Sequence, residues 1–154
     1  MTRFLSRVEQ ASDADAERVP PGGGWSVAGI AWHVAVTNEQ FAALVDGSVP
    51  LATAPEADFS ETPFSEITAL VPDKLEAPEK FHPPEGVTKA EALARARASQ
   101  ERLARALREM PESRGLWSVH SILGQVTVYQ VGDWATAHVA RHNAQAKRLI
   151  YNSQ

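Results

Sequence analysis

The chain has 154 residues, 44% of them hydrophobic, and this length supports a single domain, residues 1–154, with a core of its own. Its formal net charge of -4 argues against a nucleic-acid partner, and the absence of cysteine excludes disulfides, a cysteine nucleophile and thiolate metal ligands, so any metal must be held by nitrogen and oxygen. No stretch approaches the roughly 20 apolar residues of a membrane span, and "MTRFLSRVEQ" reaches a charge before any apolar run, so we expect a cytoplasmic protein with no membrane partner.

The first half of the chain carries two helical patterns. The first spans roughly Thr2–Arg18 and is ended by the run "PPGGG", which does not continue a helix. The second begins after Ser26, a good N-cap residue, and extends to about Asp46, with Gly47 as its stop. Its apolar residues predict one buried stripe, made of Val27, Ile30, Val34, Phe41, Leu44 and Val45.

The segment from Ser48 to Val87 is rich in proline and acidic residues and predicts a long irregular crossing, with a short helix around Ser65–Leu70. Such long connections often form or cover a site. A third helix, about Lys89–Met110, places apolar residues in alternating steps of three and four. "WSVHSILGQVT" then makes a second crossing, and a fourth helix begins near Tyr129. No stretch shows strand alternation, so we expect an all-α fold, a four-helix bundle with its long crossing between helices two and three.

Two histidines of the fourth helix stand four residues apart in "DWATAHVARHNAQAKRLI". At this spacing His138 and His142 lie within about 40° of each other on one helical face. That face carries the apolar stripe, so both imidazoles are expected to point toward the core. Taken alone, the pair fits either satisfied packing residues or metal ligands.

A third histidine, His33, lies in "GWSVAGIAWHVAVTNEQF", about 60° from Ile30 at the edge of the buried stripe of helix two. Thr37 and Gln40 lie along the same edge. If helices two and four are neighbours, three neutral imidazoles converge on one point, as a divalent transition metal requires. Three protein ligands leave a coordination position open, which is the catalytic pattern. The other two histidines, His82 and His120, fall in predicted loops, where a surface or turn role is expected.

The whole chain resembles the DinB/YfiT-like superfamily. The resemblance rests on a short N-terminal helix, "GWS" with a histidine seven residues after the serine, the long proline-containing crossing, "HSILGQVT" before the last helix and "HVARH" inside it. It implies a four-helix bundle and a metal triad, which falls here on His33, His138 and His142, with Zn or Ni as the expected ion. Relatives include hydrolases and thiol-dependent isomerases and transferases that use mycothiol, bacillithiol or glutathione, and they commonly form homodimers.

Several other polar and aromatic residues are candidates for the site. Glu39 and Asp133 project about 180° and 200° from the centres of their stripes, which predicts solvated charges rather than a general base. A surface position is also predicted for Arg141, the one candidate for binding an anion on helix four. The same is predicted for the carboxylates of the crossing, Glu56, Asp58, Glu61 and Glu66. Possible pocket residues are Thr37, Gln40, Gln100, Trp134 and Gln145. Gln100 and Gln145 are predicted to point inward and need hydrogen-bond partners. They would orient a ligand or ring nitrogens, or bond to each other.

Two functions remain open at this level. In the first, the protein is an enzyme in which the metal activates water or a thiol for hydrolysis or S-transfer on a small molecule. In the second, it is a stress-associated protein that binds a metal or small ligand without turnover. Trp32, projecting away from the stripe of helix two, predicts either cover from the long crossing or the surface of a homodimer.

Overall fold

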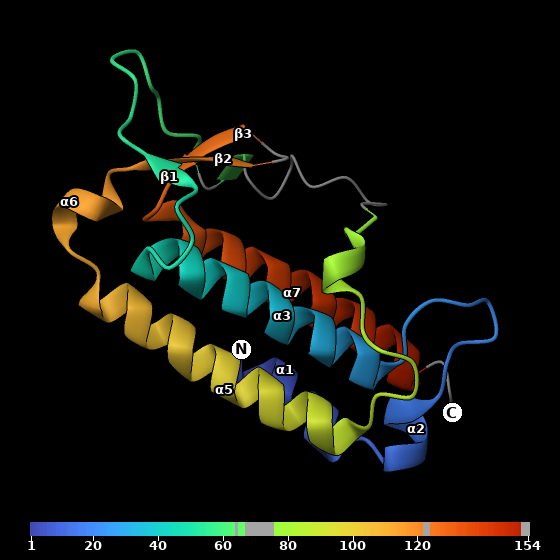
Figure 1. The fold of residues 1–154 in the computed structure, drawn as a ribbon. Coiled ribbons are helices and arrows are strands. Elements are labelled where there is room, and N and C mark those ends of the chain that lie inside the picture. Colours follow the sequence, from blue (N-terminus) through green and yellow to red (C-terminus); the bar gives the residue numbers. More distant parts are fainter. Residues whose placement is uncertain (64, 67–75, 122–123, 152–154) are drawn as a thin grey trace.

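Helices dominate the structure, a computed structural model that describes residues 1–63, 65–66, 76–121 and 124–151 (Figure 1). The α-helices are α1 (Thr2–Gln10), α2 (Asp13–Glu17), α3 (Val27–Asp46), α5 (Lys89–Glu109), α6 (Glu112–Gly115) and α7 (Gln130–Tyr151). Within the described ranges, a 3-10 turn, η1 (Glu79–Phe81), precedes α5, and the short strands are β1 (Ala52–Thr53), β2 (Ser118–Ser121) and β3 (Gly124–Thr127). The all-α expectation is confirmed in this mostly helical fold.

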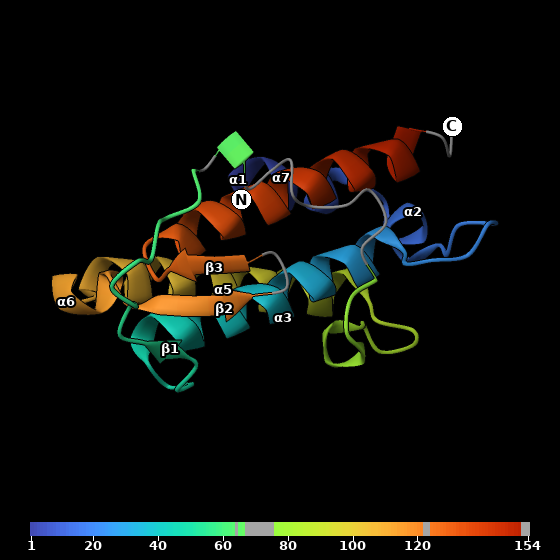
Figure 2. The same cartoon turned by 90° about the horizontal axis from the view of Figure 1, so that it is seen from above.

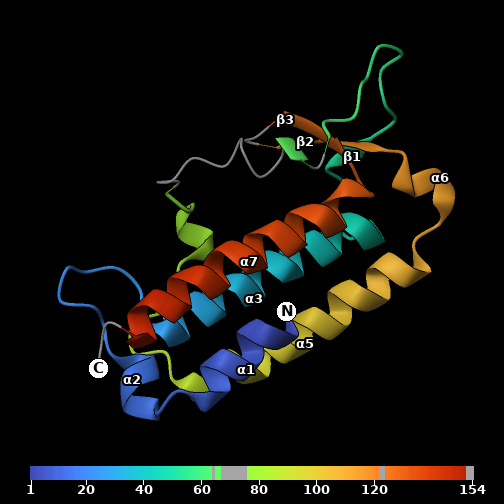
Figure 3. The same cartoon turned by 180° about the vertical axis from the view of Figure 1, so that it is seen from behind.

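The central element is α3, which packs against both α5 and α7, while α1 lies against α5 and α7 on the far side (Figures 1 and 3). Of its 20 residues, 14 are buried, so its buried surface extends well beyond the single predicted stripe. A helix that is apolar all round belongs in the interior of a bundle. The predicted contact between helices two and four, α3 and α7, is confirmed.

Local signals set the bounds of the long helices. The Ser26 side chain accepts a hydrogen bond from the Gly29 amide at the start of α3, and Gly47 ends that helix with φ of 81°, a conformation that glycine adopts at no steric cost. The guanidinium of Arg114 donates to the carbonyls of Leu44 and Val45, which the helix end leaves unpaired. Thr88 and Glu91 form a capping box at the start of α5.

The first predicted helix is interrupted. Ala11 is extended, with ψ of 144°, and Ser12 caps a new helix, α2, by accepting from the Asp15 amide. The prediction of one continuous helix over Thr2–Arg18 was therefore wrong. A serine followed by acidic residues competes with helix continuation because its hydroxyl satisfies the amides of a fresh first turn.

A small antiparallel sheet, in the order β1-β2-β3, occupies the region predicted to be free of strands (Figure 2). Val119 pairs with Val126 and with Ala52, and the three side chains join a hydrophobic cluster with residues of α3, α5 and α7. His120, expected in a loop, has its backbone in β2. Strands of two to four residues are too short to display alternation, so contacts with the helices decide their formation. Most of the short helix expected around Ser65–Leu70 lies outside the described residues.

The start of α7 also holds part of the long crossing. Thr127 and Gln130, both buried, exchange hydrogen bonds as a capping pair: each amide donates to the other residue's side-chain oxygen. The Thr127 hydroxyl donates to the carboxylate of Glu61 at 2.6 Å, and the Gln130 amide group donates to the carbonyl of Thr62. The polar cap of α7 is therefore the anchor point for residues Glu61 and Thr62.

Candidate metal centre

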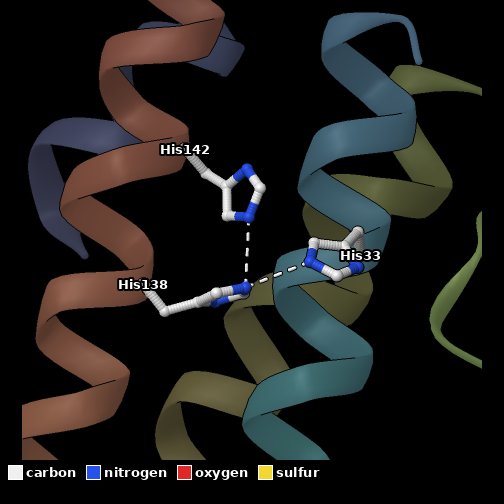
Figure 4. Close-up of side chains that lie close together, drawn as sticks. All are labelled: His33, His138 and His142. Atoms are coloured by element: carbon white, nitrogen blue, oxygen red, sulfur yellow. Dashed lines mark hydrogen bonds between the residues drawn. The ribbon is translucent and has the colours of Figure 1, made fainter. Parts of the chain in front are cut away.

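Three histidine rings meet between α3 and α7 (Figure 4). The Nε2 atom of His138 lies 3.0 Å from that of His33 and 3.1 Å from that of His142. The ligand atoms of the three residues all lie within 4.8 Å of one another, close enough to hold a metal ion. His33 and His142 are buried, at 6% and 8% exposure, and His138 is partly buried. The expected convergence of these histidines is confirmed.

Hydrogen bonds on the outer side of two rings set their tautomers. His33 Nδ1 lies 3.0 Å from the carbonyl oxygen of Phe81, and His142 Nδ1 lies 2.9 Å from Oε1 of Gln145. Because these oxygens only accept, each Nδ1 carries the proton and donates it. In a neutral ring the Nε2 atom then has a free lone pair, and both lone pairs are directed toward His138. Metal-binding histidines are commonly held in this way.

The donor set fits a divalent transition ion. Two nitrogens bound at about 2.0–2.1 Å to one ion lie roughly 2.8–3.4 Å apart for bond angles between about 90° and 110°, and the separations of His138 Nε2 from the other two Nε2 atoms fall in this range. Without a cation, two lone pairs face the single Nε2 atom of His138. The Nδ1 atom of that ring is buried and has no hydrogen-bond partner within the described part of the chain. A shared cation satisfies all three inward nitrogens together.

The surroundings keep the rings uncharged. Burial lowers the pKa of His33; the hydrogen bond to the Phe81 carbonyl offsets part of this shift, and the nearby His82 adds to it. Burial likewise lowers the pKa of His142 to about 4, and that of His138 well below its ordinary value, with the neighbouring histidines of the cluster and then Arg141 adding to the effect. Neutral imidazoles are the form that binds metal, so the cluster is ready to coordinate an ion at neutral pH.

Aromatic rings border the cluster. Trp25 stacks at a tilt on His33, with ring centroids 4.7 Å apart, and His82 meets the edge of Trp25 at 5.4 Å. Phe81 lies edge-on to His33, and Phe41 lies edge-on to His138, each at 6.4 Å. Neither Trp25 nor Phe81 was among the predicted site residues, although "GWS" and "FHPPEG" contain them.

The predicted pocket residues have separate environments. Gln145 accepts the hydrogen bond from His142 Nδ1, in line with the predicted option that it orients a ring nitrogen. The Thr37 hydroxyl donates to the His33 carbonyl within the same helix. Gln40 and Trp134 are partly buried, and the indole nitrogen of Trp134 is buried with no acceptor among the described residues. Gln100 lines a cavity of about 150 Å³ that none of the three histidines borders.

Two outward residues of α3 have intramolecular partners that the helical wheel did not reveal. Glu39 accepts two hydrogen bonds from the guanidinium of Arg95, at 2.7 and 2.8 Å. The same guanidinium lies over the Trp32 ring, 4.3 Å from its centroid. Both side chains project away from the predicted stripe, as expected, but Glu39 is ion-paired rather than free in solvent and the cover over Trp32 comes from Arg95 of α5, which packs on this face of α3.

The remaining carboxylates lie away from the histidines. Asp133 is exposed, as predicted, and so are Glu56, Asp58 and Glu66. Glu61 is held by Thr127 at the start of α7. No aspartate or glutamate of the described residues joins the group of ligand atoms formed by the three histidines.

A mostly helical fold with three histidines converging from two neighbouring helices defines a class of candidate metalloprotein. The sequence model of the DinB superfamily matches residues 1–146, and the chain belongs to this superfamily. Comparisons with curated proteins and with solved structures gave no match. None of the helices in the described ranges is long and apolar enough to cross a membrane.

Proposed function

We propose that the protein is a metal-dependent enzyme in which His33, His138 and His142 hold one divalent transition ion, Zn or Ni. The proposal rests on one observation: the two outer rings donate through Nδ1 to fixed oxygens and direct their Nε2 lone pairs at the third ring, 3.0 and 3.1 Å away. Rings arranged only for packing have no need of this shared orientation. Membership in the DinB superfamily supports the same set of ligands.

The bound ion would supply a Lewis acid that lowers the pKa of water or of an incoming thiol, so that a nucleophile is available near neutral pH. The chain's own residues orient the ligands, through Gln145 and the Phe81 carbonyl, and exclude water, through the buried faces of α3 and α7. No carboxylate base accompanies the cluster in the described ranges. We therefore place thiol-dependent S-transfer or isomerisation of a small molecule first and hydrolysis second, in a cytoplasmic homodimer.

The alternative is a stress-associated protein that binds a metal or small ligand without turnover. The two functions share the metal centre and differ only in activity. A screen of low-molecular-weight thiols against small electrophiles distinguishes them: turnover that requires the metal supports the enzyme, whereas stoichiometric metal without turnover under any thiol supports the binding protein.

Metal content is the first test. Elemental analysis of untagged protein should give about one equivalent of divalent metal per chain. A His138→Ala, His142→Ala double variant should hold none while keeping its helical circular dichroism spectrum. Equal metal affinity in the wild type and the double variant would falsify the proposed site.

A further inference from the structure

His82 lies in an exposed turn, and the metal-ligand histidines do not include it. It follows η1 in the segment from Ala77 to Pro83, the part of the long crossing that runs beside the N-terminal half of α3 (Figure 2). The His82 Nε2 atom lies 2.7 Å from the carbonyl oxygen of Ala77. Because a carbonyl only accepts, the ring donates this hydrogen bond and closes the turn across five residues.

The closed turn contacts α3 next to His33. The residue preceding His82 is Phe81, whose carbonyl accepts the hydrogen bond from His33 Nδ1. On its other side, the His82 ring meets the edge of Trp25, which in turn stacks on the His33 ring. The His82 side chain thus contacts the Ala77 carbonyl and the indole that packs on His33, and its backbone directly follows the carbonyl that orients His33 Nδ1.

A glycine on α3 makes this docking possible. A Cβ atom at Gly29, one helical turn before His33, would lie 3.2 Å from the ring of Pro83 and 3.2 Å from Cβ of Trp25. Both distances are closer than ordinary van der Waals contact, so any side chain at this position pushes the turn or Trp25 outward. The helix surface is shaped to receive the turn.

We propose that His82 is a positioning residue for the metal centre, which keeps the Phe81 carbonyl on His33 through its hydrogen bond to Ala77 and its contact with Trp25. This inference rests on the proposed metal-binding function. Losing a partner that orients a metal-binding histidine typically costs 10–100-fold in metal affinity. His82 acts on that partner at one remove, so its loss should cost about tenfold, the low end of this range.

Metal affinity of four variants of the full chain tests the proposal, measured with Zn²⁺ against a chromophoric chelator. His82→Ala should bind about tenfold more weakly than wild type. His82→Gln, whose amide nitrogen can donate in place of Nε2, should recover most of the affinity. Gly29→Ala should weaken binding although His82 is intact. Glu85→Ala, an exposed change in the same loop, is the matched control and should bind like wild type.

The outcomes distinguish a failure of the proposed metal-binding function from a failure of the positioning role of His82. If the wild type binds no metal, the metal-binding function itself fails. If the wild type binds and His82→Ala binds equally well, or if His82→Gln is as weak as His82→Ala, the positioning role is wrong. The Co²⁺-loaded proteins provide a second measurement: the visible absorption of His82→Ala should shift relative to wild type and Glu85→Ala, and identical spectra would contradict an altered His33. If His82→Ala loses its helical circular dichroism spectrum, the metal affinities of Gly29→Ala and His82→Gln test the positioning role in its place.

Discussion

Acid should destabilise the metal-free protein through the buried ring of His142. In the folded chain burial lowers the pKa of this histidine from 6.5 to about 4, whereas in the unfolded chain it returns to its ordinary value. The unfolded state therefore binds the proton first as the pH falls. The stabilising contribution of the neutral ring is complete above pH 6.5 and is lost progressively between about pH 6.5 and pH 4.

The size of the effect follows from the two pKa values. Each pH unit between them is worth about 1.4 kcal/mol of unfolding free energy. At about pH 5 the loss from His142 alone is about 2 kcal/mol, and by about pH 4 it is about 3 kcal/mol. The lowered pKa values of His33 and His138 act in the same direction. The loss from His142 is a substantial part of the roughly 5–15 kcal/mol by which a typical domain is stable against unfolding.

Urea unfolding of chelator-treated protein at about pH 7.5 and about pH 5 measures this loss. The His142→Gln variant is the control, because glutamine keeps a polar group and does not titrate. Its stability should fall by about 2 kcal/mol less than that of wild type over the same interval. Equal pH dependence in the two proteins, or no loss in the wild type, would refute the reasoning.

Further predictions concern activity, an ion pair and assembly. His33→Ala should abolish metal-dependent turnover, whereas Asp133→Asn should not, because Asp133 is exposed. In a screen of thiols and electrophiles, activity should persist at pH values well below the free thiol's pKa of about 8.5. Turnover that survives treatment with a chelator means the mechanism is wrong. Glu39→Gln should lower the free energy of unfolding by about 1 kcal/mol, since it breaks the pair with Arg95, whose two side chains are 33% and 31% exposed. It should leave metal affinity unchanged, and urea unfolding with a metal titration checks both. Light scattering at micromolar concentration should report a homodimer that Trp32→Ala does not dissociate, because Arg95 already covers that ring; a monomer contradicts the prediction.

The histidine cluster was predictable because helical periodicity acts on each helix separately. The four-residue spacing of His138 and His142 places both rings on one face, and only the adjacency of the two helices remained to be found. The hydrogen bond from His142 Nδ1 to Gln145 Oε1 lies within one turn of α7, so it too could be predicted from the sequence.

Contacts between distant segments were not predictable from periodicity. The angular position of Glu39 was correct, yet the wheel of one helix does not show that a second helix, α5, covers the opposite face. The β2-β3 pairing depends on valines packed against helices far along the chain, and a run of four residues carries too little pattern to reveal it. The Phe81 carbonyl that orients His33 is a backbone atom 48 residues away, so no residue type marks it in the sequence.

The long crossing contacts the two helices that carry the candidate ligands at two separate places. Glu61 and Thr62 hold the cap of α7, and Phe81 holds His33 of α3. Both helices that carry the candidate ligands are therefore contacted by the same connecting segment of the chain. The position of His33 and the start of α7 thus depend on one connection, the one that joins α3 to α5.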